Sequence, residues 1–254
     1  MVIVIKYGGS AMTELRLRRG VAKVIRGLKG EYQPIVVHGG GPFINRALEL
    51  AQVPSHFVRG LRVTSPESLP IIEKELSMLG KILAYEIGGA IALTGRDAKV
   101  IEAGLRDPEL GLVGDVSKVN ESLLKRLISF DLIPVISCIA ADEAGGDHAV
   151  LNVNADSVAG AIAGAFHAPV IFLSDVPGVL DNPKDPDSLL TNLSAQEIRE
   201  RIADGRIAGG MIPKVEAALE ALEHGASFAT IADGRQVEGL SAALQAKGGT
   251  QIHP

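Results

Sequence analysis

Residues 2–10 of the chain read Val-Ile-Val-Ile-Lys-Tyr-Gly-Gly-Ser, so a short apolar run leads directly into two consecutive glycines. The first four residues predict a buried strand, and the glycines predict a tight turn after it. A helical spacing of apolar residues follows at 14–28, and a second apolar run at 35–37 predicts the next strand. This alternation is typical of an α/β fold with helices on both faces of a mostly parallel sheet.

The alternation continues along the chain. Helical patterns occupy 44–50 and 66–85, and Pro66 suits the first turn of the second helix. The continuous apolar runs at 134–136 and 170–173 suit parallel strands that are buried on both faces. These patterns extend the predicted sheet through both halves of the sequence.

Two stretches, 99–118 and 140–152, interrupt this alternation. Turns rich in Gly and Asp separate short strand-like pieces there, which predicts hairpins that project from the sheet. No linker composition is visible, so we expect a single domain over 1–254. Within it we expect two lobes on one shared sheet, about 1–169 and about 170–254.

The composition excludes several classes of protein. The chain has 254 residues, 46% of them hydrophobic, and a formal net charge of -5, so nothing indicates a nucleic-acid partner. A single cysteine rules out a disulfide framework and fits a reducing compartment. The longest uncharged stretch, 157–174, is interrupted by His167 and Pro169, so a buried helix followed by a strand is favoured over a membrane span. With no targeting segment visible, we expect a cytoplasmic protein without a membrane partner.

Two glycine turns follow neighbouring predicted strands. Gly8 and Gly9 follow Lys6 and Tyr7, and residues 38–42 read His-Gly-Gly-Gly-Pro before a helix. Glycines expose backbone N–H groups, and a helix N-terminus adds positive potential, so together they favour an anion site. The alternative is a pair of tight turns required only for packing. His38 is expected to orient its loop.

Other known signatures are absent from the sequence. The only Gly-Lys pair, at 80–81, lacks the spacing of a P-loop, and no Gly-x-Gly-x-x-Gly or Gly-x-Ser-x-Gly pattern occurs. Histidines are scattered and have no cysteine partners, so no metal site is expected.

Several polar side chains outside the glycine turns are further candidates. Arg62 is a lone arginine in an apolar strand-like context, where it could bind a carboxylate or simply face solvent. Asn154 suits the N-cap of a helix, with Asp156 in its first turn. Lys214 falls near the positive end of another predicted helix, where a lysine is mildly unfavourable; this hints at function, although a solvent-facing lysine is the alternative.

Taken in order, seven segments resemble the amino acid kinase family, and within it the branch that phosphorylates N-acetyl-L-glutamate. The resemblance covers essentially the whole chain, and the segments are 6–10, 38–42, 60–64, 152–156, 174–179, 209–217 and 249–252. It implies a three-layer αβα sandwich, the amino acid kinase fold. It also implies phosphoryl transfer from MgATP to the side-chain carboxylate, giving N-acetyl-L-glutamyl 5-phosphate in arginine biosynthesis.

The resemblance also implies residue roles. The catalytic residues would be Lys6, Lys214 and Asp156, with the carboxylate orienting both lysines. The residues that bind the acceptor substrate would be Gly40, Gly41, Arg62 and Asn152. The residues that bind the nucleotide would be Gly8, Gly9, Ser174, Asp175, Val176, Gly178, Gly209, Gly210 and Met211. Mg²⁺ would be held mainly by the nucleotide phosphates.

Some features depart from the family pattern or leave alternatives open. Residues 80–83 lack an asparagine usual in the family, and 93–98 lack a common glycine, which could alter the acceptor pocket.

Arginine-inhibited relatives carry an extra N-terminal helix, so a homodimer insensitive to arginine is expected here. The alternatives are a carrier-linked aminoadipate or glutamate kinase of lysine biosynthesis and a non-catalytic ligand-binding relative. Carbamate, aspartate and uridylate kinases fit 60–64 and 152–156 less well.

Overall fold

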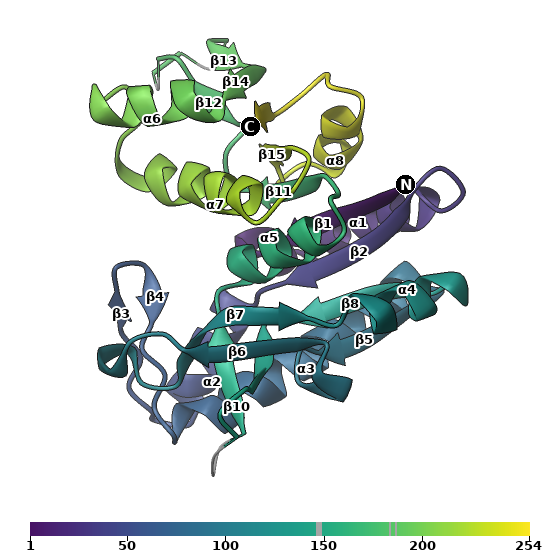
Figure 1. Ribbon diagram of the computed structural model, residues 1–254, viewed down its shortest axis with the longest axis vertical. Coiled ribbons are helices and arrows are strands. Elements are labelled where there is room, and N and C mark those ends of the chain that lie inside the picture. Colours follow the sequence, from purple (N-terminus) through teal and green to yellow (C-terminus); the bar gives the residue numbers. More distant parts are fainter. Residues whose placement is uncertain (146–148, 183, 186) are drawn as a thin grey trace.

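A computed structural model describes residues 1–145, 149–182, 184–185 and 187–254, and for Ser10 only the backbone. An eight-stranded sheet runs through the centre of the molecule (Figure 1). Its strands, in spatial order, are β14 (Asn192–Ser194), β16 (Thr250–His253), β15 (Ala229–Asp233), β11 (Val170–Ser174), β1 (Val2–Tyr7), β2 (Gln33–His38), β8 (Ile133–Ser137) and β5 (Ala90–Thr94).

The sheet is mostly parallel, as the sequence predicts. Every neighbouring pair in it is parallel except β15 with β16. Strands from the last third of the chain all lie on one side of β1, and the earlier strands lie on the other side. Figure 1 shows the same division, with the green and yellow elements at one end of the molecule.

Helices cover both faces of the sheet, so the three-layer αβα prediction is confirmed. Ile3 and Ile5 of β1 belong to a core with α1 (Leu15–Gly27), α8 (Val237–Leu244) and the second half of α3 (Ser68–Ile87). Val4, which points the opposite way, belongs to a second core with α5 (Ala155–Ala165) and α7 (Ile212–Glu223). The alternation along β1 therefore separates the two cores, as expected for a strand buried on both faces.

The remaining helices are short. They are α2 (Gly41–Leu50), α4 (Glu121–Ser129), α6 (Ala195–Ala203) and the 3-10 helices η1 (Gly9–Met12), η2 (Asp97–Lys99), η3 (Pro108–Leu110) and η4 (Gly209–Met211). The helix predicted at 44–50 begins earlier, at Gly41, because Pro42 is tolerated in a first turn. The helix predicted at 66–85 runs from Ser68 to Ile87.

Both predicted hairpins form. One joins β6 (Ile101–Leu105) to β7 (Val113–Val119), and the other joins β9 (Ile139–Asp142) to β10 (Val150–Val153). Residues 146–148 of the second hairpin lie outside the described residues. The two hairpins pair with each other into a small closed sheet, which the sequence did not predict. Two further ladders, β3 (Phe57–Val58) with β4 (Leu61–Arg62) and β12 (Val179–Leu180) with β13 (Leu189–Leu190), are two-stranded.

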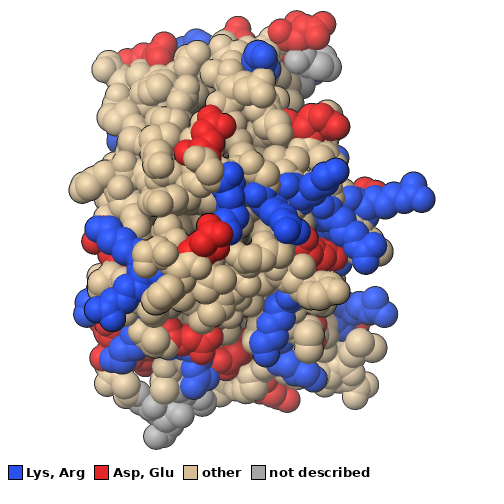
Figure 2. Space-filling view, turned by 90° about the vertical axis from the view of Figure 1, so that its right-hand side faces the viewer, with Lys and Arg blue, Asp and Glu red and all other residues tan. Residues whose placement is uncertain are grey.

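Charged side chains of both signs share the surface. Figure 2 shows a face on which Lys and Arg side chains gather across the middle, with Asp and Glu side chains among them. Within the described part of the chain, no helix combines the length and hydropathy needed to cross a bilayer.

Candidate active site

The two glycine turns lie side by side at the carboxyl edge of the sheet. They follow β1 and β2, which are parallel neighbours with Tyr7 in register with His38. The backbone N–H of Gly39 donates to the carbonyl of Tyr7 at 3.3 Å, which links the first turn to the second. A Cβ on Gly40 would lie 2.9 Å from a methyl carbon of Leu76, so a side chain at this position would force Leu76 to shift. Two bare backbone segments thus meet where ligands bind in open α/β sheets.

The N-terminus of α5 faces the first turn. The Asn154 side chain accepts a hydrogen bond from the backbone N–H of Asp156 at 2.7 Å, so the predicted cap is confirmed. The carboxylate of Asp156 also forms an ion pair with Lys6, with Nζ 2.9 Å from Oδ1. Asp156 therefore combines a position in the first helical turn with a direct contact to the lysine of β1.

Lys214 has a different partner. It is the third residue of α7, and its Nζ lies 2.7 Å from Oδ1 of Asp175, the residue after β11. The hydrogen bond from Lys214 is the main cause that lowers the pKa of Asp175. The expected arrangement, in which Asp156 orients both lysines, is therefore not the one observed: each lysine has its own carboxylate.

One small cavity brings both lysines together. Its volume is about 170 Å³, and the predicted residues that line it are Lys6, Gly8, Gly9, Ser174, Asp175 and Lys214. Arg235 also lines this cavity, and the sequence analysis did not single it out. The available signal was the Asp-Gly-Arg pattern at 233–235, which ends a short run rich in apolar residues at 229–232.

A second, more apolar cavity of about 510 Å³ is lined by residues 176–182 and 205–208 and by Met211. Val176, Gly178 and Met211 line it, as expected for one binding region, whereas Gly209 and Gly210 form the short η4 helix beside it. Gly178 has a φ of +147°, and a Cβ there would lie 2.6 Å from Oγ1 of Thr250. Only glycine fits at this turn.

Arg62 is buried, so the alternative of a solvent-facing arginine is wrong. It is 8% exposed, it donates to Oδ1 of Asn45 at 2.5 Å and to Oγ of Ser55, and it lies over the ring of Phe57. Burial lowers the pKa of the guanidinium, but no carboxylate among the described residues pairs with it. A buried cation held only by neutral groups is suited to binding an anion.

Asn152 belongs to the same network. Its Nδ2 donates to Oγ1 of Thr64 at 3.0 Å, and this hydroxyl donates to the carbonyl of Arg62 at 3.2 Å. Asn152 comes from β10 of the closed sheet, and Thr64 bridges to Gly111 ahead of β7. The pairing of the two hairpins therefore places Asn152 beside Thr64, which connects it to the backbone of Arg62.

His38 is fully buried behind the second glycine turn. Its Nδ1 lies 3.0 Å from the carbonyl oxygen of Gly39, and burial lowers its pKa to about 4. A neutral imidazole whose Nδ1–H donates to that carbonyl fixes the peptide that precedes Gly40. Nε2 has no partner among the described residues, and a Cβ on Gly80 would lie 2.8 Å from it.

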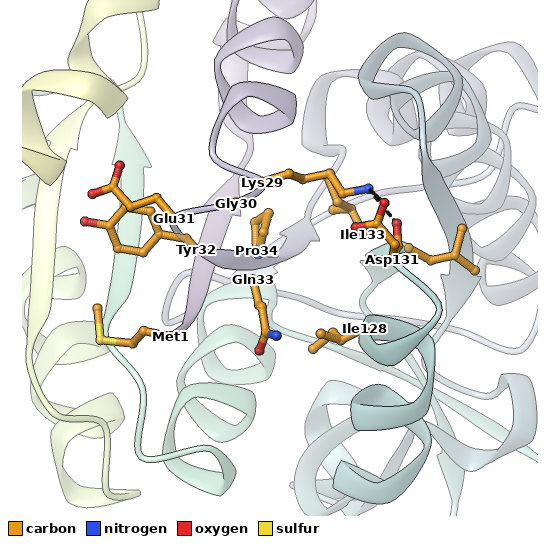
Figure 3. Close-up of a pocket in the computed structure, with 11 residues that line it drawn as sticks. Met1, Lys29, Gly30, Glu31, Tyr32, Gln33, Pro34, Ile128, Asp131 and Ile133 are labelled. Atoms are coloured by element: carbon orange, nitrogen blue, oxygen red, sulfur yellow. Dashed lines mark hydrogen bonds and ion pairs between the residues drawn. The ribbon is translucent and has the colours of Figure 1, made fainter.

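One further cavity lies away from this region. A cavity at the amino end of β1, β2 and β8 is closed on one side by an ion pair between Lys29 and Asp131, 2.7 Å long (Figure 3). It lies at the opposite edge of the sheet from the glycine turns. Among the described residues, no group of three His, Cys, Asp or Glu side chains could hold a metal ion.

Comparisons with known proteins agree with this architecture. The model of the amino acid kinase family matches residues 1–233. The acetylglutamate kinase of Deinococcus radiodurans is 48% identical over 252 residues, which are 99% of this chain and 100% of that protein. The acetylglutamate kinase of Thermus thermophilus is 43% identical over an alignment of 257 positions, which covers 99% of this chain and 98% of that protein. The crystal structure of smu.665 from Streptococcus mutans has a TM-score of 0.79 at 29% identity, and covers 99% of this chain and 98% of that one.

Proposed function

Because this chain belongs to the amino acid kinase family, we propose that it transfers the γ-phosphoryl group of ATP to the side-chain carboxylate of N-acetyl-L-glutamate. The product would be N-acetyl-L-glutamyl 5-phosphate, an intermediate of arginine biosynthesis. The observation that carries this proposal is that Lys6 and Lys214, 208 positions apart by their numbers, line one cavity with two bare glycines. The high identity to two acetylglutamate kinases supports the choice of acceptor.

Phosphoryl transfer depends on alignment of the reactants and on neutralisation of charge at the phosphoryl oxygens. In the proposed reaction the ammonium groups of Lys6 and Lys214 contact those oxygens, one from β1 and the other from α7. Ion pairs with Asp156 and Asp175 hold the two lysines in position. The N–H groups of the glycine turns supply further donors that need no reorganisation when charge moves.

The acceptor would bind on the other side of the glycine turns. Arg62, a buried cation without a carboxylate partner among the described residues, would take the α-carboxylate in a bidentate pair. Asn152 would bind the N-acetylamino group, and Gly40 and Gly41 would approach the reacting carboxylate. A carboxylate nucleophile is already ionised at neutral pH, so the reaction requires no general base.

The nucleotide would span both cavities. The adenosine would occupy the apolar cavity lined by Val176, Gly178 and Met211, next to Gly209 and Gly210. Its phosphates would reach Gly8, Gly9, Ser174 and the two lysines. The nearby carboxylates are already paired with cations, which suits Mg²⁺ held mainly by the nucleotide phosphates, where it neutralises their charge.

The proposal also covers the two lobes of the chain, its compartment and its oligomeric state. Residues 1–169 would form the acceptor lobe and residues 170–254 the nucleotide lobe of one cytoplasmic enzyme. It would act as a homodimer. An exposed apolar stripe on α3, made of Met78, Ile82 and Tyr85, supports self-association, because these side chains share one helical face.

An acceptor panel tests the proposal. The purified protein would be incubated with MgATP, hydroxylamine and one acceptor, and the hydroxamate from any acyl phosphate would be measured. The acceptors are N-acetylglutamate, glutamate, N-acetylaspartate, aspartate, carbamate, UMP and carrier-linked aminoadipate. We expect turnover with N-acetylglutamate well above all others; ADP release would be followed for acceptors that form no hydroxamate. Preference for another acceptor, or no turnover, would contradict the proposal.

A further inference from the structure

Arg235 is a third cation at the cavity that holds Lys6 and Lys214. It follows β15, whose last residue, Asp233, is in register with Ser174 of β11. We propose that the Arg235 guanidinium binds the β- and γ-phosphates of the nucleotide. This inference rests on the proposed function, since it assumes a nucleoside triphosphate in the adjoining cavities.

Asp233 holds the guanidinium in place. Nε of Arg235 donates to Oδ1 of Asp233 at 2.9 Å, Nη2 donates to Oδ2 at 2.8 Å, and the backbone N–H of Arg235 donates to Oδ1 at 2.9 Å. The hydrogen bond from Arg235 is the main cause that lowers the pKa of Asp233, so the pair stays ionised at neutral pH. Nη1 has no hydrogen-bond partner in the described part of the chain, which leaves donors for a ligand.

The loop that carries Arg235 is seated tightly on the end of β11. The backbone N–H of Gly234 donates to the carbonyl of Ser174 at 2.6 Å. A Cβ on Gly234 would lie 3.1 Å from Cβ of Leu173, and a Cβ on Gly239 would lie 1.9 Å from the carbonyl oxygen of Asp233. The base of the arginine therefore has a fixed position, whereas its side chain is 52% exposed and open to a ligand.

The charges of the cavity fit a polyphosphate. Three cations face it, and each is paired with one carboxylate: Lys6 with Asp156, Lys214 with Asp175, and Arg235 with Asp233. The three pairs are neutral overall, and a polyphosphate would supply further anionic oxygens to all three cations. A guanidinium presents its donors in a planar fork that matches two phosphate oxygens, whereas a lysine ammonium acts as a point charge.

A second Asp-Gly-Arg segment, residues 204–206, forms the same kind of ion pair. Nε and Nη2 of Arg206 both donate to Oδ2 of Asp204, at 2.8 and 2.5 Å, so the aspartate and the arginine of this pattern pair with each other wherever the segment lies. Arg206, however, lies at the apolar cavity, whereas Arg235 lies beside the two lysines. The position of Arg235, rather than its ion pair, identifies phosphate as the ligand.

Calorimetric titration of AMP, ADP and ATP into the wild type, Arg235→Gln and Arg235→Lys tests this inference. Loss of a charge-assisted hydrogen bond predicts about tenfold weaker binding of ADP and ATP to Arg235→Gln. AMP, which lacks the β- and γ-phosphates, is expected to bind all three proteins equally. Arg235→Lys keeps the charge but loses the fork, so its affinities for ADP and ATP should lie between the other two.

Arg106→Gln is the matched control, because Arg106 is similarly exposed and pairs with Asp115 at 2.8 Å on the β6–β7 hairpin. We expect it to bind all three nucleotides like the wild type. Equal losses for AMP, ADP and ATP in the Arg235 variants, or no loss, would overturn the inference and leave the proposed function intact. A wild type that binds no ATP would instead contradict the proposed function. If Arg235→Gln does not fold, Arg235→Lys decides the comparison.

Discussion

The Nζ atom of Lys6 lies 2.9 Å from Oδ1 of Asp156, so an ion pair joins the end of β1 to the first turn of α5. Both side chains are partly shielded from solvent, with exposed fractions of 17% and 31%. The carboxylate holds the ammonium group beside the glycine turns. This pre-positioning is what electrostatic stabilisation of a transition state requires.

Lys6→Met should therefore lower kcat far more than it changes KM for ATP or for N-acetylglutamate. Removal of one group that stabilises transition-state charge predicts a loss of about 100- to 1,000-fold in kcat. Steady-state hydroxamate assays with each substrate varied in turn would measure this split. Lys118→Met is the control, because Lys118 pairs with Glu102 on the surface. Turnover of Lys6→Met close to that of the wild type would contradict the assigned role.

Arg62→Lys should act on the acceptor alone. A lysine keeps the charge but cannot make two parallel hydrogen bonds to a carboxylate, so KM for N-acetylglutamate should rise about 10- to 100-fold. KM for ATP should not change. Arg59→Lys, in the same β3–β4 hairpin but exposed and paired with Asp107, should leave both constants unchanged. A parallel rise of both KM values in Arg62→Lys would show a general defect instead of a lost acceptor contact.

Much of the fold could be predicted because its signals are local. The apolar runs around β1 and β11 have the length of strands, and the glycines after β1 and β2 mark the functional edge of the sheet. The N-cap at Asn154 could also be predicted from its immediate neighbours. Each of these features depends on residues close together in the sequence.

The features that could not be predicted depend on pairing between distant segments. Nothing in either hairpin alone indicates that β6 and β7 close a sheet with β9 and β10, and that closure places Asn152 beside Thr64. Similarly, the partner of Lys214 is set by how α7 packs near the end of β11. The burial of Arg62 depends on Asn45 and Ser55, which its own sequence context does not reveal.

Gly178→Ala should destabilise the protein. The φ of +147° disfavours any side chain, and the new Cβ would lie 2.6 Å from Oγ1 of Thr250, which accepts from the backbone N–H of Val179. We expect the free energy of unfolding to fall by about 2 kcal/mol or more, measured by urea denaturation.

Gly27→Ala is the matched control for that substitution. Gly27 ends α1, and a Cβ there would meet no atom within 4 Å. Alanine restricts the unfolded chain, so the free energy of unfolding should rise by about 0.5–1 kcal/mol. Equal effects of the two substitutions would contradict the account of the turn at Gly178.

His38 should make stability depend on pH. Burial lowers its pKa from 6.5 to about 4 in the folded protein. Below pH 6.5 the unfolded chain therefore binds a proton that the folded chain does not accept until about pH 4. The stability from this residue is complete above pH 6.5, and it is lost as the pH falls towards 4, by about 1.4 kcal/mol per pH unit.

Urea unfolding at a series of pH values between 7 and 4 would compare the wild type with His38→Asn. The asparagine amide can still donate to the carbonyl of Gly39, but it does not titrate, so this slope should disappear from the variant. The two curves of unfolding free energy should therefore converge as the pH falls, even if the variant is less stable at pH 7. Parallel curves over this window would mean that His38 titrates equally in the folded and unfolded states. A fully buried imidazole, with one nitrogen that has no partner among the described residues, should not do so.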